Sequence, residues 1–282
     1  MTRPDRRLKD GRISVYRHPA AVRLAHWINV VAFLVMLTSG LQIFIAHPAL
    51  YLGDDSTFDR PLFSMTAEAT PDNRLVGYTT ILGKRFETTG TFGVIEQAGY
   101  PTERALPTWM TLPPFRDLAT GRVWHFFFAW VLAINGAFYL AYNLAGGRVG
   151  RELWPTRAQL RAVGRSIADH ARLRFPRGEA ARRYNVLQKL SYLAAVFVLG
   201  PLMILTGMAM SPGLNAALPW LPEVFGGRQS ARTIHFLVAM SLVLFTVVHL
   251  LMVLAAGPLN ELRSMITGRY VIDPARGRET QA

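Results

Sequence analysis

Residues 232–254 read RTIHFLVAMSLVLFTVVHLLMVL, an apolar run that is long enough to cross a bilayer and contains two histidines. His235 and His249 are 14 residues apart, so they leave one face of a helix about 21 Å apart along its axis. An imidazole at membrane depth is costly without a hydrogen-bond partner, a proton path or a metal. The spacing favours one kind of ligand bound twice, once beside each histidine, at two depths in the membrane. The other interpretation is two interhelical hydrogen bonds.

The composition is that of a basic membrane protein. Hydrophobic residues make up 51% of the 282 residues and charged residues 17%, with a net charge of +13. Because the chain has no cysteine, it has no disulfide, no thiolate-bound iron–sulfur cluster and no covalent c-type haem. Any cofactor must therefore be held by other side chains.

Four apolar runs are each long enough for a membrane helix, namely residues 22–46, 123–145, 187–210 and 232–256. They predict an all-α membrane protein, a bundle of four transmembrane helices within one domain, residues 1–282. The first twenty residues are charged and the first run is long, which favours an uncleaved helix over a signal peptide.

Four crossings place both termini on one side of the membrane. Of the 31 Lys and Arg, 22 lie in the segments assigned to that side, residues 1–23, 145–189 and 257–282. This excess predicts that both termini are cytoplasmic. The basic charge is then a topology signal and requires no nucleic acid. The basic loop 146–186 is expected to include an amphipathic helix that faces water or lipid headgroups.

The periplasmic connection, residues 47–121, is far longer than a helix hairpin needs, which is typical of a functional or docking segment. Within it, Tyr78–Leu82 and Arg85–Thr89 are β-rich and flank Gly83-Lys84, a candidate two-residue turn with Gly first. The alternative is an irregular cap that binds no partner.

The starts of three membrane helices share the spacing Arg-x-x-His. The pairs are Arg23 with His26, Arg122 with His125, and Arg232 with His235. Each arginine lies one turn nearer the membrane surface than its histidine, a position that suits haem propionates. The alternative is that these arginines only anchor helix ends by snorkelling. Leu37-Thr-Ser-Gly40 and Leu205-Thr-Gly207, near the ends of the first and third helices, echo one another.

Depth in the membrane sorts four histidines into two pairs. His26 begins an outward helix and His249 ends an inward one, so both lie in the cytoplasmic half. His125 and His235 both begin inward helices and lie in the periplasmic half. Two pairs at two levels predict two bis-histidine haems. His18 and His47 lie near membrane interfaces and His170 lies in the basic loop. They look ordinary, and roles at the interface stay open for them.

Two glycines extend this two-level arrangement. Gly40 follows His26 by 14 residues and Gly136 follows His125 by 11, so each shares the face of its histidine at the level of the other haem. A helix with no side chain there lets a ring edge approach closely. The alternative is that both glycines serve helix packing.

The chain resembles the four-helix dihaem cytochrome b subunits of bacterial respiratory complexes. This group includes prokaryotic cytochrome b561 and the membrane subunits of formate dehydrogenase and nickel–iron hydrogenase, and the likeness is strongest to the thiosulfate reductase cytochrome b branch. The resemblance rests on RLAHW (23–27), GYTTILGKRF (77–86), DLATGRVWHFFFAW (117–130) and FGGRQSARTIHF (225–236). It implies two haem b groups with iron ligands His26, His125, His235 and His249. It also implies a bacterial inner membrane, a quinone, and a periplasmic oxidoreductase that in this branch is often molybdopterin-dependent.

The resulting functional interpretation is an electron-transfer subunit between a quinone pool and a periplasmic oxidoreductase, with no catalytic residue of its own. The quinone is expected at the cytoplasmic end near His26, among Tyr16, Arg17, His18 and Lys189. One alternative is a stand-alone cytochrome b561 that passes electrons from a small donor such as superoxide to quinone. Another is a haem-free transporter or anchor.

Overall fold

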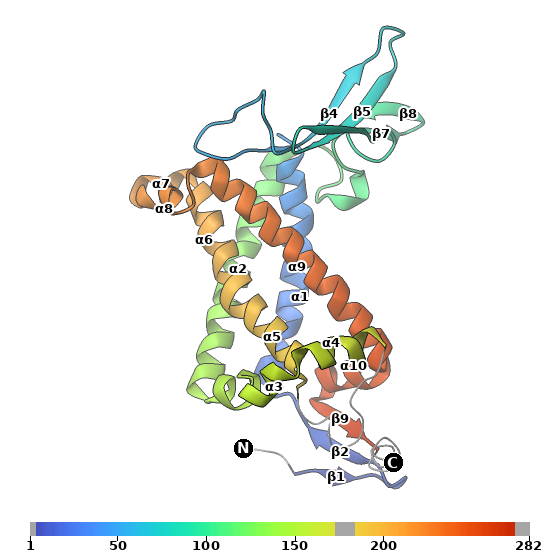
Figure 1. Ribbon diagram of the computed structural model, residues 1–282, viewed down its shortest axis with the longest axis vertical. Helices are drawn as coiled ribbons and strands as arrows, with labels where there is room; N and C mark the ends of the chain where they lie inside the picture. The colour runs from blue at the N-terminus through green and yellow to red at the C-terminus, as the bar shows by residue number, and fades with distance from the viewer. Residues whose placement is uncertain (1–3, 173–183, 274–282) are drawn as a thin grey trace. The chain divides into compact units, whose positions relative to one another are not determined.

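The computed structural model describes residues 4–172 and 184–273 and contains four helices long and apolar enough to span a membrane (Figure 1). Their mean hydropathy is 1.5–2.6, yet only 6–11% of the residues in these windows are buried within the protein. Such exposed apolar surface requires lipid around it. The predicted all-α membrane fold is therefore confirmed. The spans are α1 (Ala20–Phe44), α2 (Leu118–Ala145), the third span (Val186–Met210) and α9 (Arg228–Ala256).

Polar caps start two of the spans earlier than the apolar runs suggest. The α2 helix begins at Leu118 rather than 123, because the Asp117 carboxylate accepts a hydrogen bond from the Thr120 amide at 3.0 Å. The α9 helix begins at Arg228 rather than 232. The third span is composed of α5 (Val186–Ala194), the π turn η4 (Ala195–Leu199) and α6 (Gly200–Met210).

The chain divides into two compact units, and each contains part of every membrane helix. The unit that holds both chain ends, here the terminal unit, is Met1–Asn29, Ile134–Gly200 and Ser241–Ala282. The other, here the connector unit, is Val30–Ala133 and Pro201–Met240 and includes the connection between α1 and α2. We describe each unit by itself.

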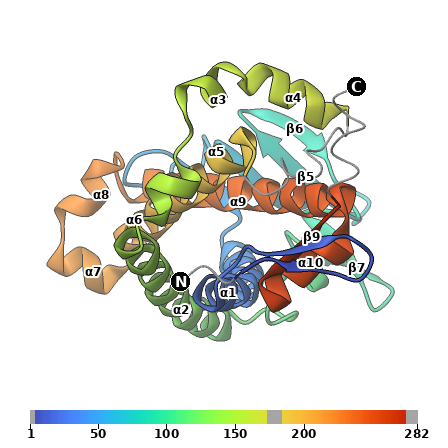
Figure 2. The same cartoon turned by 90° about the horizontal axis from the view of Figure 1, so that it is seen from below.

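In the terminal unit a small antiparallel sheet joins segments from the two ends of the chain. Its order is β1-β2-β9, and β2 pairs with β9 from Ile13↔Ile272 to Tyr16↔Arg269. The Asn260 side chain, on α10, forms hydrogen bonds with both the amide and the carbonyl of Val271 on β9. Figure 2 shows α10 beside β9. The elements are β1 (Arg6–Arg7), β2 (Ile13–Tyr16), β9 (Arg269–Ile272) and α10 (Pro258–Thr267).

The basic loop of the terminal unit is helical where it is described. It contains the π turn η2 (Val149–Leu153), α3 (Arg157–Arg161) and α4 (Val163–Ala171). The Thr156 hydroxyl and the Gln159 side chain form a reciprocal capping box at the start of α3. Residues 173–183 of the expected loop lie outside the described residues.

The segment between α1 and α2, which belongs to the connector unit, is folded into β strands. A four-stranded antiparallel sheet has the order β3-β4-β5-β6, and β7 pairs with β8. The predicted hairpin is confirmed as β5–β6, but its turn lies one residue earlier, because Ile81 pairs with Lys84. Leu82 and Gly83, with φ of 49° and 78°, are the two central residues, as a type I′ turn requires. The strands are β3 (Ala49–Leu50), β4 (Phe63–Ala69), β5 (Leu75–Ile81), β6 (Lys84–Glu87), β7 (Val94–Gln97) and β8 (Tyr100–Glu103).

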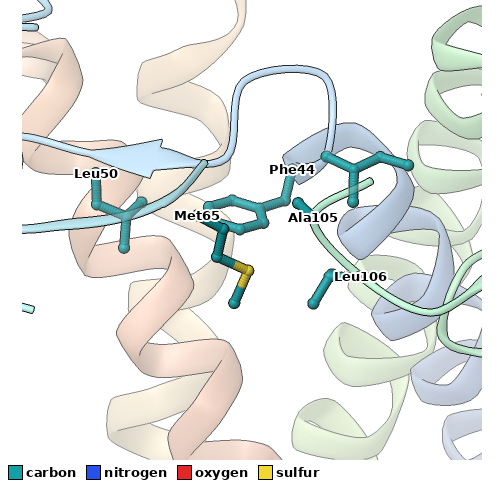
Figure 3. Close-up of a cluster of buried hydrophobic side chains, with 6 residues drawn as sticks. Phe44, Leu50, Met65, Ala105 and Leu106 are labelled. Carbon is teal, nitrogen blue, oxygen red and sulfur yellow. The ribbon is translucent and has the colours of Figure 1, made fainter. Parts of the chain in front are cut away.

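A hydrophobic cluster joins this β structure to the end of α1 (Figure 3). Its side chains come from α1 and the turn after it, from β3 and β4, and from the segment after β8, and burial of such side chains stabilises the connection by about 1.5–3 kcal/mol each. The connection is thus a structured part of the unit and not an irregular cap. The cluster consists of Phe44, Ile45, Leu50, Met65, Ala105 and Leu106. The unit also contains η1 (Thr108–Met110), α7 (Pro212–Ala217) and α8 (Trp220–Val224).

The start of α9 is bonded to the loop that follows α1. The Gly53 carbonyl accepts hydrogen bonds from the amides of Gln229 and Ser230, and the Gly53 amide donates to the Ser230 hydroxyl. The Thr233 hydroxyl donates to the Tyr51 carbonyl at 2.6 Å. These bonds satisfy amides that have no partner within the helix and hold the turn that precedes His235.

Candidate functional site

The connector unit brings the rings of His125 on α2 and His235 on α9 close together. Their ring centroids are 6.3 Å apart, at an interplanar angle of 64°. Nδ1 of His125 lies 3.2 Å from the Ser39 hydroxyl oxygen and 3.2 Å from the Met36 carbonyl oxygen, both on α1. Nδ1 of His235 lies 3.0 Å from the Thr206 hydroxyl oxygen on α6. In both rings, Nδ1 is engaged by a neighbouring helix.

The terminal unit contains the second pair, His26 on α1 and His249 on α9. Their ring centroids are 6.5 Å apart, at 58°. His26 also meets the Trp27 ring edge to face, and His249 stacks on Phe245 at 12°. Among the described residues, Nδ1 of His26 is buried without a hydrogen-bond partner. A buried polar atom of this kind is costly and is typical of a site that binds a further group.

Both pairs have a ring separation that two imidazoles sharing one metal ion would have. Metal–imidazole bonds of about 2.0–2.1 Å place two opposed ring nitrogens about 4 Å apart, with each centroid one ring radius further back. The observed separations of 6.3 and 6.5 Å fit this arrangement. In residues 4–172 and 184–273, no group of three or more His, Asp or Glu side chains could hold a metal. Each pair therefore offers only two ligands, which suits haem, because the macrocycle supplies the other four.

Glycines on helices without a ligand in the connector pair lie against its rings. A Cβ at Gly40 would be 3.1 Å from Cε1 of His125, and a Cβ at Gly207 would be 3.4 Å from Cε1 of His235. Gly136 differs, since a Cβ there would meet no atom within 4 Å. Gly40 and Gly136 are expected from spacing, whereas Gly207 is not. The sequence feature that could have indicated Gly207 is the likeness between Leu205-Thr-Gly207 and Leu37-Thr-Ser-Gly40.

The three arginines expected near haem propionates contact the protein itself. The Arg23 guanidinium donates to the Ile266 carbonyl, and that of Arg232 donates to the His47 carbonyl. The Arg122 guanidinium lies 5.7 Å from the centroid of the Phe126 ring. Binding of propionates by these side chains stays a prediction.

A buried polar cluster surrounds His18 in the terminal unit. The Tyr184 hydroxyl lies 3.5 Å from Nδ1 of His18, and the Arg17 guanidinium lies over the rings of Tyr184 and Tyr270 at 5.1 and 4.9 Å. Burial, followed by the positive charge of Arg17, lowers the pKa of His18 to about 3. Burial raises the pKa of Glu261, which lies 4.0 Å from Arg17. At neutral pH His18 is thus uncharged and able to exchange hydrogen bonds with a neutral ligand.

Comparison with known proteins assigns the chain to a family. The family model described as prokaryotic cytochrome b561 matches residues 17–268, a range that includes all four paired histidines. The chain belongs to the prokaryotic cytochrome b561 family. It is accordingly a multi-pass membrane protein that binds b-type haem and serves electron transport. The narrower likeness to the thiosulfate reductase branch stays a prediction.

One curated relative of this cytochrome b561 is a protein of Azospira oryzae. It is 27% identical over 236 residues, which cover 84% of this chain and 89% of the relative, and it is named as a putative protein-methionine-sulfoxide reductase subunit, YedZ1. No solved structure matches the chain.

Proposed function

We propose that this cytochrome b561 binds two haem b groups and transfers electrons between a quinone pool and a separate oxidoreductase. The observation that carries the proposal is the presence of two histidine pairs with nearly equal centroid separations, 6.3 and 6.5 Å, one in each unit. A chain that bound one haem would need only one such pair.

In this proposal α9 supplies one ligand to each haem, His235 and His249, while His125 on α2 and His26 on α1 supply the others. When bound, the haems supply reversible one-electron chemistry, and the chain supplies ligation, orientation and electrostatics. Since the haems carry the redox chemistry in this proposal, it requires no acid–base or nucleophile constellation in the chain.

The proposed orientation puts both termini in the cytoplasm of a bacterial cell and the connection between α1 and α2 in the periplasm. It is supported by the 22 of 31 Lys and Arg that lie in residues 1–23, 145–189 and 257–282. The folded sheet of the connector unit then offers a periplasmic surface for a protein partner, which a small diffusing donor would not require.

The name of the Azospira relative suggests the kind of partner. That protein is named as a subunit of a protein-methionine-sulfoxide reductase, and a reductase consumes electrons. We therefore propose that electrons run from quinol through the chain to a periplasmic reductase, of which methionine sulfoxide reductase is the favoured example. A molybdopterin cofactor in that partner stays a prediction from the family resemblance.

The β5–β6 hairpin is the proposed docking element, because it ends in exposed apolar side chains at an unpaired sheet edge. Leu82 is 74% exposed and Phe86 is 51% exposed. Replacing residues 80–85 by Asn-Gly shortens the hairpin by two residue pairs, which keeps the alternation of hydrogen-bonded pairs along the ladder and a type I′ turn. We expect unchanged haem spectra and an electron transfer rate to the partner that is lower by about tenfold or more, the effect of losing an interface hot spot.

Stopped-flow spectroscopy of quinol-reduced protein mixed with the partner measures this rate. A matched deletion in the β1–β2 turn, Lys9–Gly11, should leave the rate unchanged. Wild-type transfer by the shortened β5–β6 variant would show that the hairpin is not the docking element.

The quinone is proposed to bind in the terminal unit beside the buried His18 cluster. Lys189 is also buried in the terminal unit. Its ammonium lies 3.3 Å from the Gln159 side-chain oxygen and 3.4 Å from the Trp154 carbonyl oxygen. We expect His18→Ala and Lys189→Ala each to slow quinol-dependent haem reduction about tenfold, because each removes a hydrogen bond of about 1.5 kcal/mol to the quinone.

The rate is measured at limiting quinol concentration, and dithionite gives the total reducible haem. Arg165, which is exposed, provides the control. In Arg165→Ala, quinol should reduce the haem at the wild-type rate. Unchanged rates in both His18→Ala and Lys189→Ala would rule out this location for the quinone.

A further inference from the structure

Two buried hydroxyl groups contact the histidines of the connector unit, and neither was expected from sequence. Thr206 and Ser39 are both fully buried. The Thr206 hydroxyl donates to the Leu202 carbonyl at 2.7 Å, so its single proton is directed along its own helix. The same oxygen is 3.0 Å from Nδ1 of His235. With that proton on the carbonyl, the oxygen offers only lone pairs to the ring, which assigns the proton of His235 to Nδ1.

Ser39 makes the same arrangement at His125. Its hydroxyl donates to the Val35 carbonyl at 2.5 Å, and its oxygen lies 3.2 Å from Nδ1 of His125. The Met36 carbonyl oxygen, which can only accept, is also 3.2 Å from this Nδ1. Both acceptors require a proton on Nδ1 of His125. In both rings the unprotonated nitrogen is then Nε2, the atom that can bind a metal.

A glycine follows each hydroxyl residue and contacts the same ring. Gly40 follows Ser39, and Gly207 follows Thr206. A methyl group added at Gly40 would lie 3.1 Å from Cε1 of His125, and one added at Gly207 would lie 3.4 Å from Cε1 of His235. Each ring thus lies against a hydroxyl–glycine step on a helix that supplies no ligand to this pair. We name this step the hydroxyl–glycine cradle.

We propose that Ser39 and Thr206 are positioning residues that fix His125 and His235 in the tautomer with free Nε2 and so set the properties of the haem they hold. This inference rests on the proposed function. An Nδ1–H bond to an acceptor raises the basicity of the metal-bound Nε2, which stabilises oxidised iron. In the terminal unit, by contrast, Nδ1 of His26 is buried without such a partner among the described residues.

The test is a redox titration of the purified full-length chain, followed by visible and electron paramagnetic resonance spectra. In Thr206→Val, which keeps the shape but removes the acceptor, one haem component should shift to a more positive midpoint potential with altered g values. The other component should not move. Ser39→Ala should shift the same component in the same direction. Thr206→Ser should restore the wild-type potential.

A matched control is Thr38, whose hydroxyl, among the described residues, bonds its own helix, at 2.9 Å from the Leu34 carbonyl and 3.3 Å from the Val35 carbonyl. Thr38→Ala should leave both components in place. An unshifted Thr206→Val, or equal shifts of both components, would overturn the proposal. A chain with a single haem that still shifts in Thr206→Val would refute the two-haem function but support the cradle.

Discussion

Replacing His235 with alanine is expected to lower the haem content from two to one per chain, and His249→Ala should do the same to the other haem. Each histidine faces one partner ring, His125 or His26, at a centroid distance of 6.3 or 6.5 Å. Loss of a residue that only hydrogen-bonds a ligand lowers metal affinity about 10–100-fold. Loss of an iron ligand itself should lower haem affinity by more. Pyridine haemochrome assays give the stoichiometry, and redox titration shows which component remains.

His170 provides the control for this pair of variants. It lies on α4, where Nδ1 is 2.8 Å from the Ser166 carbonyl oxygen, so His170→Ala should retain both haems. Circular dichroism should show that all variants keep their helices. Loss of the same component in His235→Ala and His249→Ala would contradict the assignment, as would loss of all haem in both folded variants.

The second large effect is expected from filling a glycine beside a ring. Gly40→Phe should expel or strongly perturb the haem held by His125 and His235, since even a methyl group there would lie 3.1 Å from Cε1 of His125. Overpacking of this kind costs about 1–3 kcal/mol, and here the strain falls on a ligand. Gly136→Phe, in the terminal unit, should instead perturb the haem held by His26 and His249.

A two-component redox titration separates these outcomes. Gly164 on α4 is an exposed helical glycine whose Cβ would meet nothing within 4 Å, and Gly164→Phe should leave both components unchanged. If Gly40→Phe altered only the component that survives in His235→Ala, the proposed placement of Gly40 would be wrong.

The membrane helices could be predicted from their long apolar runs. The histidine pairing could be predicted from spacing along one helix. Fourteen residues between His235 and His249 bring both rings to one face, and the direction of each span decides which other histidine lies at the same depth. The structure brings His26 near His249 and His125 near His235. Haem ligation by these residues stays a prediction.

The strand pairings that join distant segments and the hydroxyl contacts could not be predicted in the same way. The alternation in β5 and β6 indicates a hairpin, but nothing local shows that β3 pairs with β4 or that β2 pairs with β9. Thr206 and His235 lie on different helices, so only the repeated hydroxyl–glycine step hints at their contact. Leu82 at positive φ is an uncommon choice, which explains the one-residue error in the turn.

The most direct test of the two-haem proposal is the haem content of the unmodified, purified chain. The pyridine haemochrome assay, referred to protein concentration from amino-acid analysis, should give two haem b groups per chain, with two components in the redox titration. A single haem per chain with a single component, in protein that retains its helices, would contradict the proposal that each histidine pair holds its own haem.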